Sequence, residues 1–330
     1  MNVLVTGGAG FIGSNLVDEL GKNVRVVVLD NFSSGKRSNL AHHEGKANVD
    51  IIEGDIRDKE LVRRVTKDID IVYHLAVQCL RVSINDPEIN HEVNATGTLN
   101  LCMAAHENKV RRFVYVSSSE VYGTALKAPM AETHPKEPMT VYGASKLAGE
   151  QYTLAYNRTY GMKTMVVIPF NTYGPREHYE GVHGEVIPKF VLRALNDERP
   201  VIFGDGSQTR DFTYVADTVK GIILASKCDD MIGQSVNIAR GEEVSIRTIA
   251  EKIYHKLGKS HLLPIMEKAR PGDVQRHFAG VEKAERFFGF RAEVGIDEGL
   301  DIFIEWFTSQ GYDLGRLMKE DVVYNWEARK

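Results

Sequence analysis

Two side chains suited to redox chemistry, Tyr142 and Lys146, stand four residues apart in the sequence. On a helix, positions i and i+4 share one face, so the phenol and the ammonium group would lie side by side. A neighbouring positive charge lowers the pKa of a phenol, and a tyrosinate can take a proton from an alcohol while hydride leaves the alcohol carbon. A serine run, Ser117 to Ser119, precedes the pair by about twenty residues and offers hydroxyl groups to hold the reacting oxygen. The spacing therefore predicts oxidation of an alcohol by a bound hydride acceptor.

A glycine loop, with Gly7, Gly10 and Gly13, directly follows the first apolar run. Here glycine permits a tight turn, a close approach of the backbone to a pyrophosphate, and close packing of the next helix on the strand. The diphosphate would lie on the free N–H groups of the helix N-terminus. Asp30 ends the second strand, 17 residues past Gly13, where a carboxylate would bind the adenosine ribose and repel the extra phosphate of NADP. The pattern predicts NAD as the cofactor.

The elements that must position these groups alternate along the first half of the chain. Short apolar runs at 3–5, 24–29, 49–52, 69–75, 113–116 and 164–168 are separated by amphipathic patterns at 14–21, 59–66, 94–108 and 144–160. This order predicts a doubly wound, Rossmann-type α/β fold with a parallel sheet buried on both faces. After Pro169, glycine and proline become frequent. We expect an NAD-binding domain over 1–169 and a smaller C-terminal α/β substrate domain over 170–330, with 212–240 able to pack back on the first.

Composition excludes several other classes of protein. The 330 residues carry a formal net charge of −4 with mixed signs and no basic stripe, so a nucleic-acid partner is not expected. Three widely spaced cysteines, Cys79, Cys102 and Cys228, and the lack of clustered histidines predict no metal site and a reducing, cytoplasmic location. Met1 and Asn2 lead straight into the first strand, and no apolar stretch approaches the roughly 20 residues that span a bilayer. No membrane partner is expected.

Over nearly the whole chain the motifs resemble those of the extended short-chain dehydrogenase/reductases, the nucleotide-sugar epimerase/dehydratase family. The resemblance rests on the glycine loop, Asp30, Asp55-Ile56, His74-Leu75-Ala76, Asn94, the serine run, Tyr142 with Lys146, and the segment from Asn171 to Arg176. It continues in the segments 204–206, 209–212 and 270–273. The sequence departs from many relatives at Val77, where they have a second alanine.

The resemblance implies an NAD site, a nucleotide-diphosphate sugar as substrate, and a homodimer formed through a four-helix bundle of 94–108 and 144–160. The implied NAD-binding residues are Gly7, Gly10, Phe11, Ile12, Gly13, Asp30, Asn31, Ser34, Gly35, Asp55, Ile56, Leu75, Ala76, Val77, Asn94, Ser117, Tyr142, Lys146 and Pro169. The implied substrate-binding residues are Ser118, Asn171, Val186, Ile187, Lys189, Arg210, Arg270 and Asp273. Arg210 and Arg270 would hold the diphosphate, for which a planar fork of donors is well suited.

Glu120 bears on which reaction of the family to expect. Enzymes of this kind start with removal of the sugar C4 hydroxyl proton by the residue equivalent to Tyr142, while hydride passes to NAD. The stretch Ser118-Ser119-Glu120-Val121-Tyr122-Gly123 resembles that of the dehydratases, which implies Glu120 as the base at C5. Ser119 stands where thymidine-diphosphoglucose dehydratases carry an aspartate as acid. We expect a dehydratase of UDP-sugars with Tyr142, Lys146, Ser118, Ser119 and Glu120 as catalytic residues.

Other readings stay open at this point. The segments 30–35 and 78–83 resemble those of the 4-epimerases acting on UDP-glucose or UDP-N-acetylglucosamine. A UDP-glucuronate decarboxylase would need an arginine for the substrate carboxylate, with Arg81 and Arg176 as candidates. Glu120 could instead only cap or ion-pair at the strand end, and Cys79, near the expected sugar site, is interpreted as an inert thiol without a neighbouring base. A non-catalytic NAD-sensing protein is disfavoured because both Tyr142 and Lys146 are present.

Overall fold

The computed structural model describes residues 1–327 and is built on a parallel sheet. Within these residues seven strands form that sheet in the order β11-β6-β5-β4-β1-β2-β3, and all neighbouring strands run parallel. The strands are β1 (Asn2–Thr6), β2 (Arg25–Asp30), β3 (Val49–Glu53), β4 (Ile71–His74), β5 (Arg112–Val116), β6 (Thr164–Pro169) and β11 (Ser235–Ile238). The predicted doubly wound α/β fold is confirmed.

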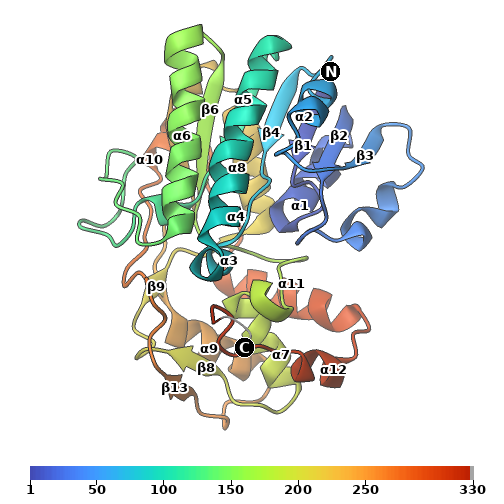
Figure 1. Ribbon diagram of the computed structural model, residues 1–330. Helices are drawn as coiled ribbons and strands as arrows, with labels where there is room; N and C mark the ends of the chain where they lie inside the picture. Colours follow the sequence, from blue (N-terminus) through green and yellow to red (C-terminus); the bar gives the residue numbers. More distant parts are fainter. Residues whose placement is uncertain (328–330) are drawn as a thin grey trace.

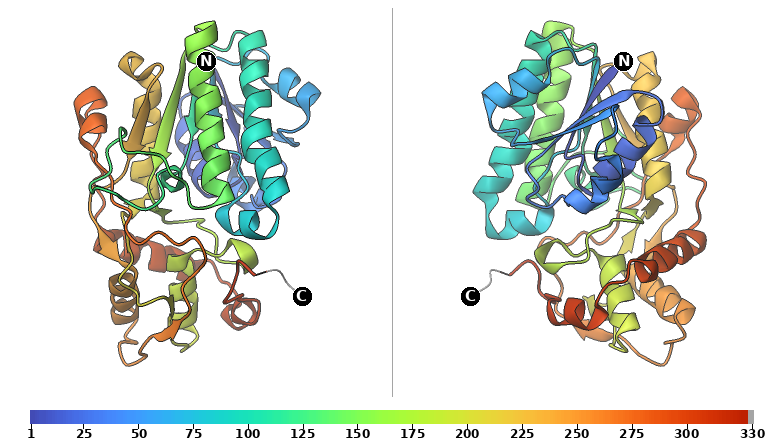
Figure 2. Two further views of the ribbon diagram at one scale, coloured as in Figure 1. Left: turned by 60° about the vertical axis from the view of Figure 1, so that its left-hand side comes forward. Right: turned by 90° about the vertical axis from the view of Figure 1, so that its right-hand side faces the viewer.

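Both faces of the sheet are buried, which explains its continuous apolar strands. Successive side chains of a strand point to opposite faces, so Val3 and Val5 lie in one core cluster and Leu4 in the other. The first cluster contains α1 (Phe11–Leu20) and α8 (Val215–Lys227). The second contains α2 (Lys59–Val65), α5 (Thr98–Glu107) and α6 (Val141–Tyr160). Figure 2 shows these two helical layers on opposite sides of the sheet.

The predicted helix over 94–108 is longer and less regular than expected. It is preceded by α3 (Leu80–Asn85) and α4 (Pro87–His91), and it starts with a π-helical segment, η2 (Glu92–Gly97), before α5. Such segments occur often at functional sites because they redirect side chains within a helix. Periodicity could not reveal the π-helical segment, since it spans only six residues and buries the polar Asn94 along with Val93 and Ala95.

Apart from α8, α10 and β11, which belong to the sheet and its covering helices, most of the chain beyond Pro169 forms a second, smaller layer of structure below the sheet in Figure 1. Its strands pair as β8 (Val201–Phe203) with β13 (Ile265–Glu267), β9 (Thr209–Arg210) with β12 (Val244–Ser245), and β7 (Thr172–Tyr173) with β10 (Thr213–Tyr214). Its helices are α7 (Val186–Leu195), α9 (Ile246–Lys256), α11 (Ile296–Ser309) and α12 (Leu314–Lys319), whereas α10 (Glu282–Phe288) packs on β11 and α8. Short 3-10 segments are η1 (Arg37–His43), η3 (Ser119–Val121), η4 (Gly181–His183) and η5 (Asp229–Met231).

No helix within residues 1–327 has both the length and the apolar content needed to cross a membrane.

Candidate active site

A cavity of about 470 Å³ opens at the carboxyl edge of the sheet and continues toward α7 and β8. Residues just after β1, β2, β4, β5 and β6 line it, including Gly7, Asn31, Leu75, Ser117 and Asn171. This edge is where doubly wound sheets bind their ligands, because the loops that follow parallel strands gather there. A cavity of this size is typical of small-molecule and cofactor sites.

The glycine loop forms one end of the cavity. Gly7 has φ +68°, and a Cβ there would lie 2.7 Å from the backbone N of Ala76. A Cβ on Gly13 would lie 2.0 Å from the carbonyl oxygen of Gly7. No other residue type fits these two positions without a backbone shift. The N-terminus of α1 therefore stands open to the cavity, as a diphosphate requires.

Asp30 supports this loop and faces the cavity. Its Oδ2 accepts a hydrogen bond from the Ala9 N–H at 2.9 Å, and its Oδ1 accepts from the Phe32 N–H at 2.8 Å. Burial raises the Asp30 pKa, and these two hydrogen bonds oppose that rise. Each carboxylate oxygen can accept a further hydrogen bond, so a ribose fits beside the loop.

The predicted pair on α6 lies in the same cavity. Thr140 caps the helix by accepting a hydrogen bond from the Gly143 N–H. Tyr142 and Lys146, one turn apart, both line the cavity. The Lys146 Nζ donates to the Val116 carbonyl at 2.7 Å, and burial lowers the Lys146 pKa to about 7.

The Tyr142 phenol does not behave as the spacing alone predicts. Burial raises its pKa above the ordinary value, and a hydrogen bond with the Ser118 side chain opposes the rise. The expected lowering by Lys146 does not accompany this shift: burial and the nearby charges of Glu120, Cys79 and Glu185 raise the Tyr142 pKa, and burial also lowers the pKa of Lys146. The positive nicotinamide of a bound NAD would add the charge that favours tyrosinate.

The serine run follows β5 directly, and its last residue, Ser119, begins η3. The hydroxyl of Ser117 donates to Glu150, and Ser118 caps η3 by accepting from the Glu120 N–H. Ser119 is buried, and its carbonyl accepts from the His277 ring at 3.0 Å. All three serines and Glu120 line the cavity.

The Glu120 carboxyl is the least satisfied acidic group of this wall. Its buried Oε2 has no hydrogen-bond partner among the described residues. Burial raises its pKa, and the charges of Arg270 and Arg210 oppose the rise. A structural cap or ion pair would use this carboxyl, so the geometry agrees better with a group that meets a ligand.

Two arginines converge on one carboxylate deeper in the cavity. Oδ1 of Asp273 accepts from the Nη2 of Arg210 at 2.6 Å and from the Nη2 of Arg270 at 2.8 Å. Two positive charges thus share one negative charge, and the buried Nε of Arg270 has no partner within the described residues. The Nδ2 of Asn171, also in the cavity wall, is unpartnered in the same way. An anionic, hydrogen-bonding ligand fits this wall.

Comparison with known proteins agrees with this geometry. The sequence profile of the NAD-dependent epimerase/dehydratase family matches residues 3–239. The chain belongs to this family. The match confirms three predictions: the fold, the family recognised from the motifs, and NAD as the cofactor.

The relatives of this family member carry out different reactions. A Methanocaldococcus jannaschii protein, provisionally assigned as a UDP-glucose 4-epimerase, is 37% identical over 308 residues, 92% of this chain and 97% of that protein. The dTDP-glucose 4,6-dehydratase of Streptomyces venezuelae, solved with NAD bound, superimposes with a TM-score of 0.90 at 32% identity over 94% of this chain and 98% of that one. The UDP-N-acetylglucosamine 4-epimerase of Methanobrevibacter ruminantium gives 0.88 at 34% identity, with 94% and 98% covered. The chain is thus similar to both epimerases and dehydratases.

Most residues predicted for the family's NAD and substrate sites share the one cavity, and three lie outside its described lining. Ile187 is fully buried in the core. Gly35 lies behind Asp30, where its Cβ would be 3.0 Å from Oδ1. Asn94 is buried and holds the backbone of Gln78. The predicted residues that line the cavity are Gly7, Gly10, Phe11, Ile12, Gly13, Asp30, Asn31, Ser34, Asp55, Ile56, Leu75, Ala76, Val77, Ser117, Ser118, Ser119, Glu120, Tyr142, Lys146, Pro169, Asn171, Val186, Lys189, Arg210, Arg270 and Asp273.

Sequence reasoning missed a charged cluster in the same wall. Arg81 is buried and pairs with Glu185, with Nη1 3.2 Å from Oε2. The Sγ of Cys79 lies 3.5 Å from the Nδ1 of His183, so the thiol does have a neighbouring base, contrary to expectation. Burial raises the Cys79 pKa, but Arg81 and His183 outweigh it and the net shift is downward. His183 and Glu185 are about a hundred residues from Cys79 and belong to no motif, so no local signal could reveal them.

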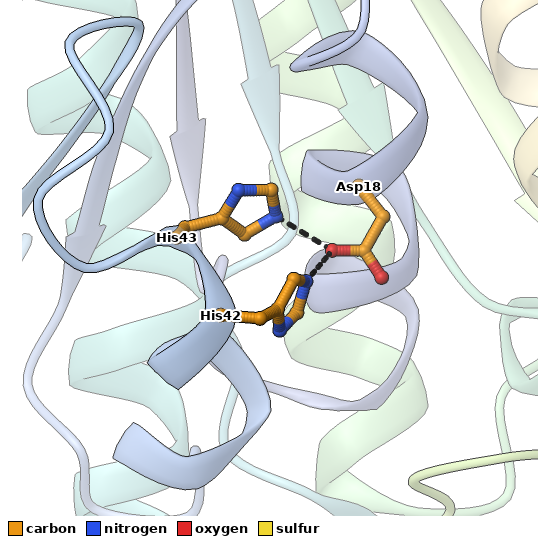
Figure 3. A group of neighbouring side chains, drawn as sticks. All are labelled: Asp18, His42 and His43. Carbon is orange, nitrogen blue, oxygen red and sulfur yellow. Dashed lines mark hydrogen bonds and ion pairs between the residues drawn. The ribbon is translucent and has the colours of Figure 1, made fainter.

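Sequence reasoning also missed a second cluster, outside the cavity lining, in which His42 and His43 of η1 meet Asp18 of α1 (Figure 3). The Nε2 atoms of His42 and His43 each lie 2.7 Å from Oδ1 of Asp18, so the expectation of no clustered histidines is wrong. The three side chains are close enough together to hold a metal ion. However, Arg176 donates to Oδ2 of Asp18 at 2.7 Å, and each imidazole can satisfy Oδ1 with its own N–H. The cluster ties η1 and Arg176 to the helix of the glycine loop.

Proposed function

We propose that this protein is an NAD-dependent nucleotide-sugar dehydratase that acts on UDP-sugars with Glu120 as the base. The observation that carries the proposal is the buried, unpartnered Glu120 carboxyl in the wall that also holds Tyr142. Its charge acts on the Tyr142 phenol, so the two groups lie within electrostatic reach of one another. A carboxyl in an apolar cleft is costly unless a function retains it.

In the proposed reaction, Ser118 and Tyr142 hold the sugar C4 hydroxyl, and Tyr142 takes its proton. The glycine loop and Asp30 would hold NAD, which would supply the hydride acceptor for C4 and, later in the same turnover, the hydride donor for C6. The ketone at C4 acidifies the C5 proton, which the Glu120 carboxylate removes, while the hydroxyl at C6 leaves as water. A raised pKa makes Glu120 a stronger base, and the proton that it takes from C5 can then pass to the C6 hydroxyl as that group leaves as water. Arg210 and Arg270 hold the diphosphate in place.

Binding partners follow from the same proposal. Solved relatives are described with UDP-glucose, UDP-N-acetylmuramic acid and UDP-glucuronic acid, which supports a uridine-diphosphate sugar here. We also propose a homodimer through α5 and α6, whose outer faces expose Met103 and Tyr160. Burial of these side chains in a helix bundle would stabilise the pair of chains.

A 4-epimerase is the second candidate, and Ser119 favours it. A dehydratase needs a proton for the leaving hydroxyl, whereas Ser119 is buried and offers only a hydroxyl. Epimerisation needs no such acid, because hydride simply returns to the other face of the ketone.

The decarboxylase is less supported than either. Arg81 is neutralised by Glu185, and Arg176 pairs with Asp18 outside the described cavity lining. Arg81 is thus already paired, and Arg176 is not placed in the described cavity wall where a substrate carboxylate would lie.

Product analysis separates these candidates. The protein is incubated separately with UDP-glucose, UDP-N-acetylglucosamine and dTDP-glucose, and the products are identified by NMR. A 4-keto-6-deoxy sugar supports the dehydratase. Inversion at C4 without loss of water overturns it in favour of the 4-epimerase, and Tyr142→Phe serves as the inactive control in either case.

A further inference from the structure

A segment near the end of the described chain forms one wall of the cavity. After α12 the chain turns back toward α7, as the dark red end of the ribbon in Figure 1 shows. Four of its residues, Asp321, Val323, Asn325 and Trp326, line the cavity. We call residues 321–326 the closing segment.

Asp321 attaches the closing segment to α7. Its side chain is only 2% exposed, and its two oxygens lie 3.0 Å from the Nζ of Lys189 and 3.1 Å from the Nη1 of Arg193. The Lys189 Nζ also donates to the Val322 carbonyl at 2.6 Å. Two cations of the cavity wall are thereby occupied by the closing segment itself.

Asn325 attaches the segment to a second element. Its Nδ2 donates to the Gly184 carbonyl at 2.9 Å and to the Val182 carbonyl at 3.3 Å. The closing segment is therefore held at both ends, and its inner side chains have defined positions.

Trp326 forms an aromatic corner with Phe203 of β8. Their ring centroids lie 4.5 Å apart at 80°, and both rings line the cavity. Val201, Ile202 and Ile246 add apolar surface to the same lining. An aromatic corner with apolar neighbours suits a planar, uncharged ring system, which can pack its face on one ring and its edge on the other.

The charges of the cavity distinguish a region that favours an anion from the apolar region at the closing segment. At Arg210 and Arg270 one carboxylate serves two cations and an Nε stays free, which favours an anion. At the closing segment Lys189 and Arg193 face two carboxylates, Asp321 and, 3.9 Å from Arg193, Glu198, and both cations also donate to backbone carbonyls, so less attraction for phosphate is left. We propose that the closing segment binds the nucleobase of the substrate, with Trp326 as the residue that packs against it.

This inference rests on the proposed nucleotide-sugar substrate, and uridine diphosphate is the probe that tests it. The protein has two tryptophans, Trp306 and Trp326, and Trp306 packs on Phe303 and Phe307 of α11 outside the described cavity lining. Trp306→Phe leaves Trp326 as the sole tryptophan, and its fluorescence should change saturably as uridine diphosphate is added. In Trp326→Phe the remaining Trp306 should show no change.

Affinity provides the second measurement. By calorimetry, Trp326→Ala should weaken binding of uridine diphosphate about fivefold or more, whereas Trp326→Phe should keep most of the affinity. Binding of inorganic pyrophosphate, which has no base, should be equal in Trp326→Ala and in the unmodified protein. Thermal unfolding of each variant shows whether the fold is retained.

The outcomes separate this inference from the proposed reaction. Equal affinity of folded Trp326→Ala and unmodified protein for uridine diphosphate overturns the role of Trp326, whatever the products are. Weakened binding of pyrophosphate as well as uridine diphosphate also overturns it, since the segment would then support the site as a whole. If the unmodified protein binds uridine, thymidine, guanosine and adenosine diphosphates no better than pyrophosphate, both proposals fail. A 4-epimerase product with the expected affinities overturns only the dehydratase.

Discussion

The side chain of Asn94 closes two hydrogen bonds with the backbone of Gln78. Its Oδ1 accepts from the Gln78 N–H at 2.8 Å, and its Nδ2 donates to the Gln78 carbonyl at 3.0 Å. The same Nδ2 lies 3.1 Å from the hydroxyl of Ser145 on α6. Asn94 is therefore a positioning residue that links the loop after β4, with Val77 and Cys79 in the cavity wall, to the helix of Tyr142 and Lys146.

Asn94→Ala should loosen that loop. It removes the partner of the Gln78 N–H, while the Gln78 carbonyl keeps its hydrogen bond from Asn90, so we expect a loss of about 1–3 kcal/mol of stability and a lower content of bound NAD. Chemical denaturation and the NAD released on unfolding measure the two effects. Asn108→Ala, which removes hydrogen bonds to Arg63 and Thr66 far from the cavity, is the matched control. Equal NAD content in both variants would contradict the positioning role.

Glu120→Gln separates the two candidate reactions. The amide keeps the size of the side chain but cannot remove a C5 proton, so dehydration should fall by about 10²- to 10⁴-fold. Turnover in deuterium oxide, followed by NMR, shows whether C5 exchanges its proton. A dehydratase that still exchanges C5 after this change would rule out Glu120 as the base, and an epimerase should lose little activity.

Gly13→Ala should abolish retention of NAD. The added methyl group would lie 2.0 Å from the Gly7 carbonyl oxygen, so the glycine loop must shift. In the proposed reaction hydride is returned within each turnover, so the unmodified protein should retain NAD through purification. The NAD released from denatured protein is measured for both. Gly315→Ala, whose Cβ would meet only a side-chain oxygen at 3.6 Å, should retain as much NAD as the unmodified protein.

Asp18→Asn should destabilise the protein in a pH-dependent way. Burial raises the Asp18 pKa, but Arg176, His43 and His42 outweigh it and hold the folded-state value below 3.8. The contribution of Asp18 is therefore present above pH 3.8 and is lost as the pH falls through the lower folded-state value. Because the side chain is partly exposed, we expect only about 1 kcal/mol at pH 7.

Urea unfolding of Asp18→Asn and the unmodified protein at pH 7 and at pH 3 tests this sign. The difference in unfolding free energy should be larger at pH 7. A difference that grows toward pH 3 would show that the ion pair with Arg176 does not contribute as described.

The sequence predicted the fold, and it predicted which residues meet at the glycine-loop end of the cavity, because both depend on local patterns. Gly7, Gly13 and Asp30 follow their strands directly, and the parallel sheet brings the strand ends together. Tyr142 and Lys146 follow from helical spacing. Ile187 shows the limit of such reasoning, since a motif does not tell which side of α7 faces the core.

What the sequence could not reveal depends on contacts between distant segments. Glu185 meets Arg81 across 104 residues, and Asn325 meets Gly184 across 141. Neither pair has a periodic or motif signal, and each exists only because the second half of the chain folds over the carboxyl edge of the sheet. The burial that raises the Tyr142 pKa is likewise a property of the assembled cavity.

Because β11 is an edge strand of the sheet, the sheet is complete only with a strand that comes about 65 residues after β6 in the sequence. β11 pairs with β6 over four residues, and α8 covers the same face of the sheet as α1. A fragment that ends at Pro169 would leave the backbone of β6 as an open edge and expose Val114, Val116 and Val167. Such an edge recruits strands from other molecules, so the cofactor-binding half is prone to self-association when it is made without the rest. During synthesis the sheet cannot be completed until β11 has left the ribosome.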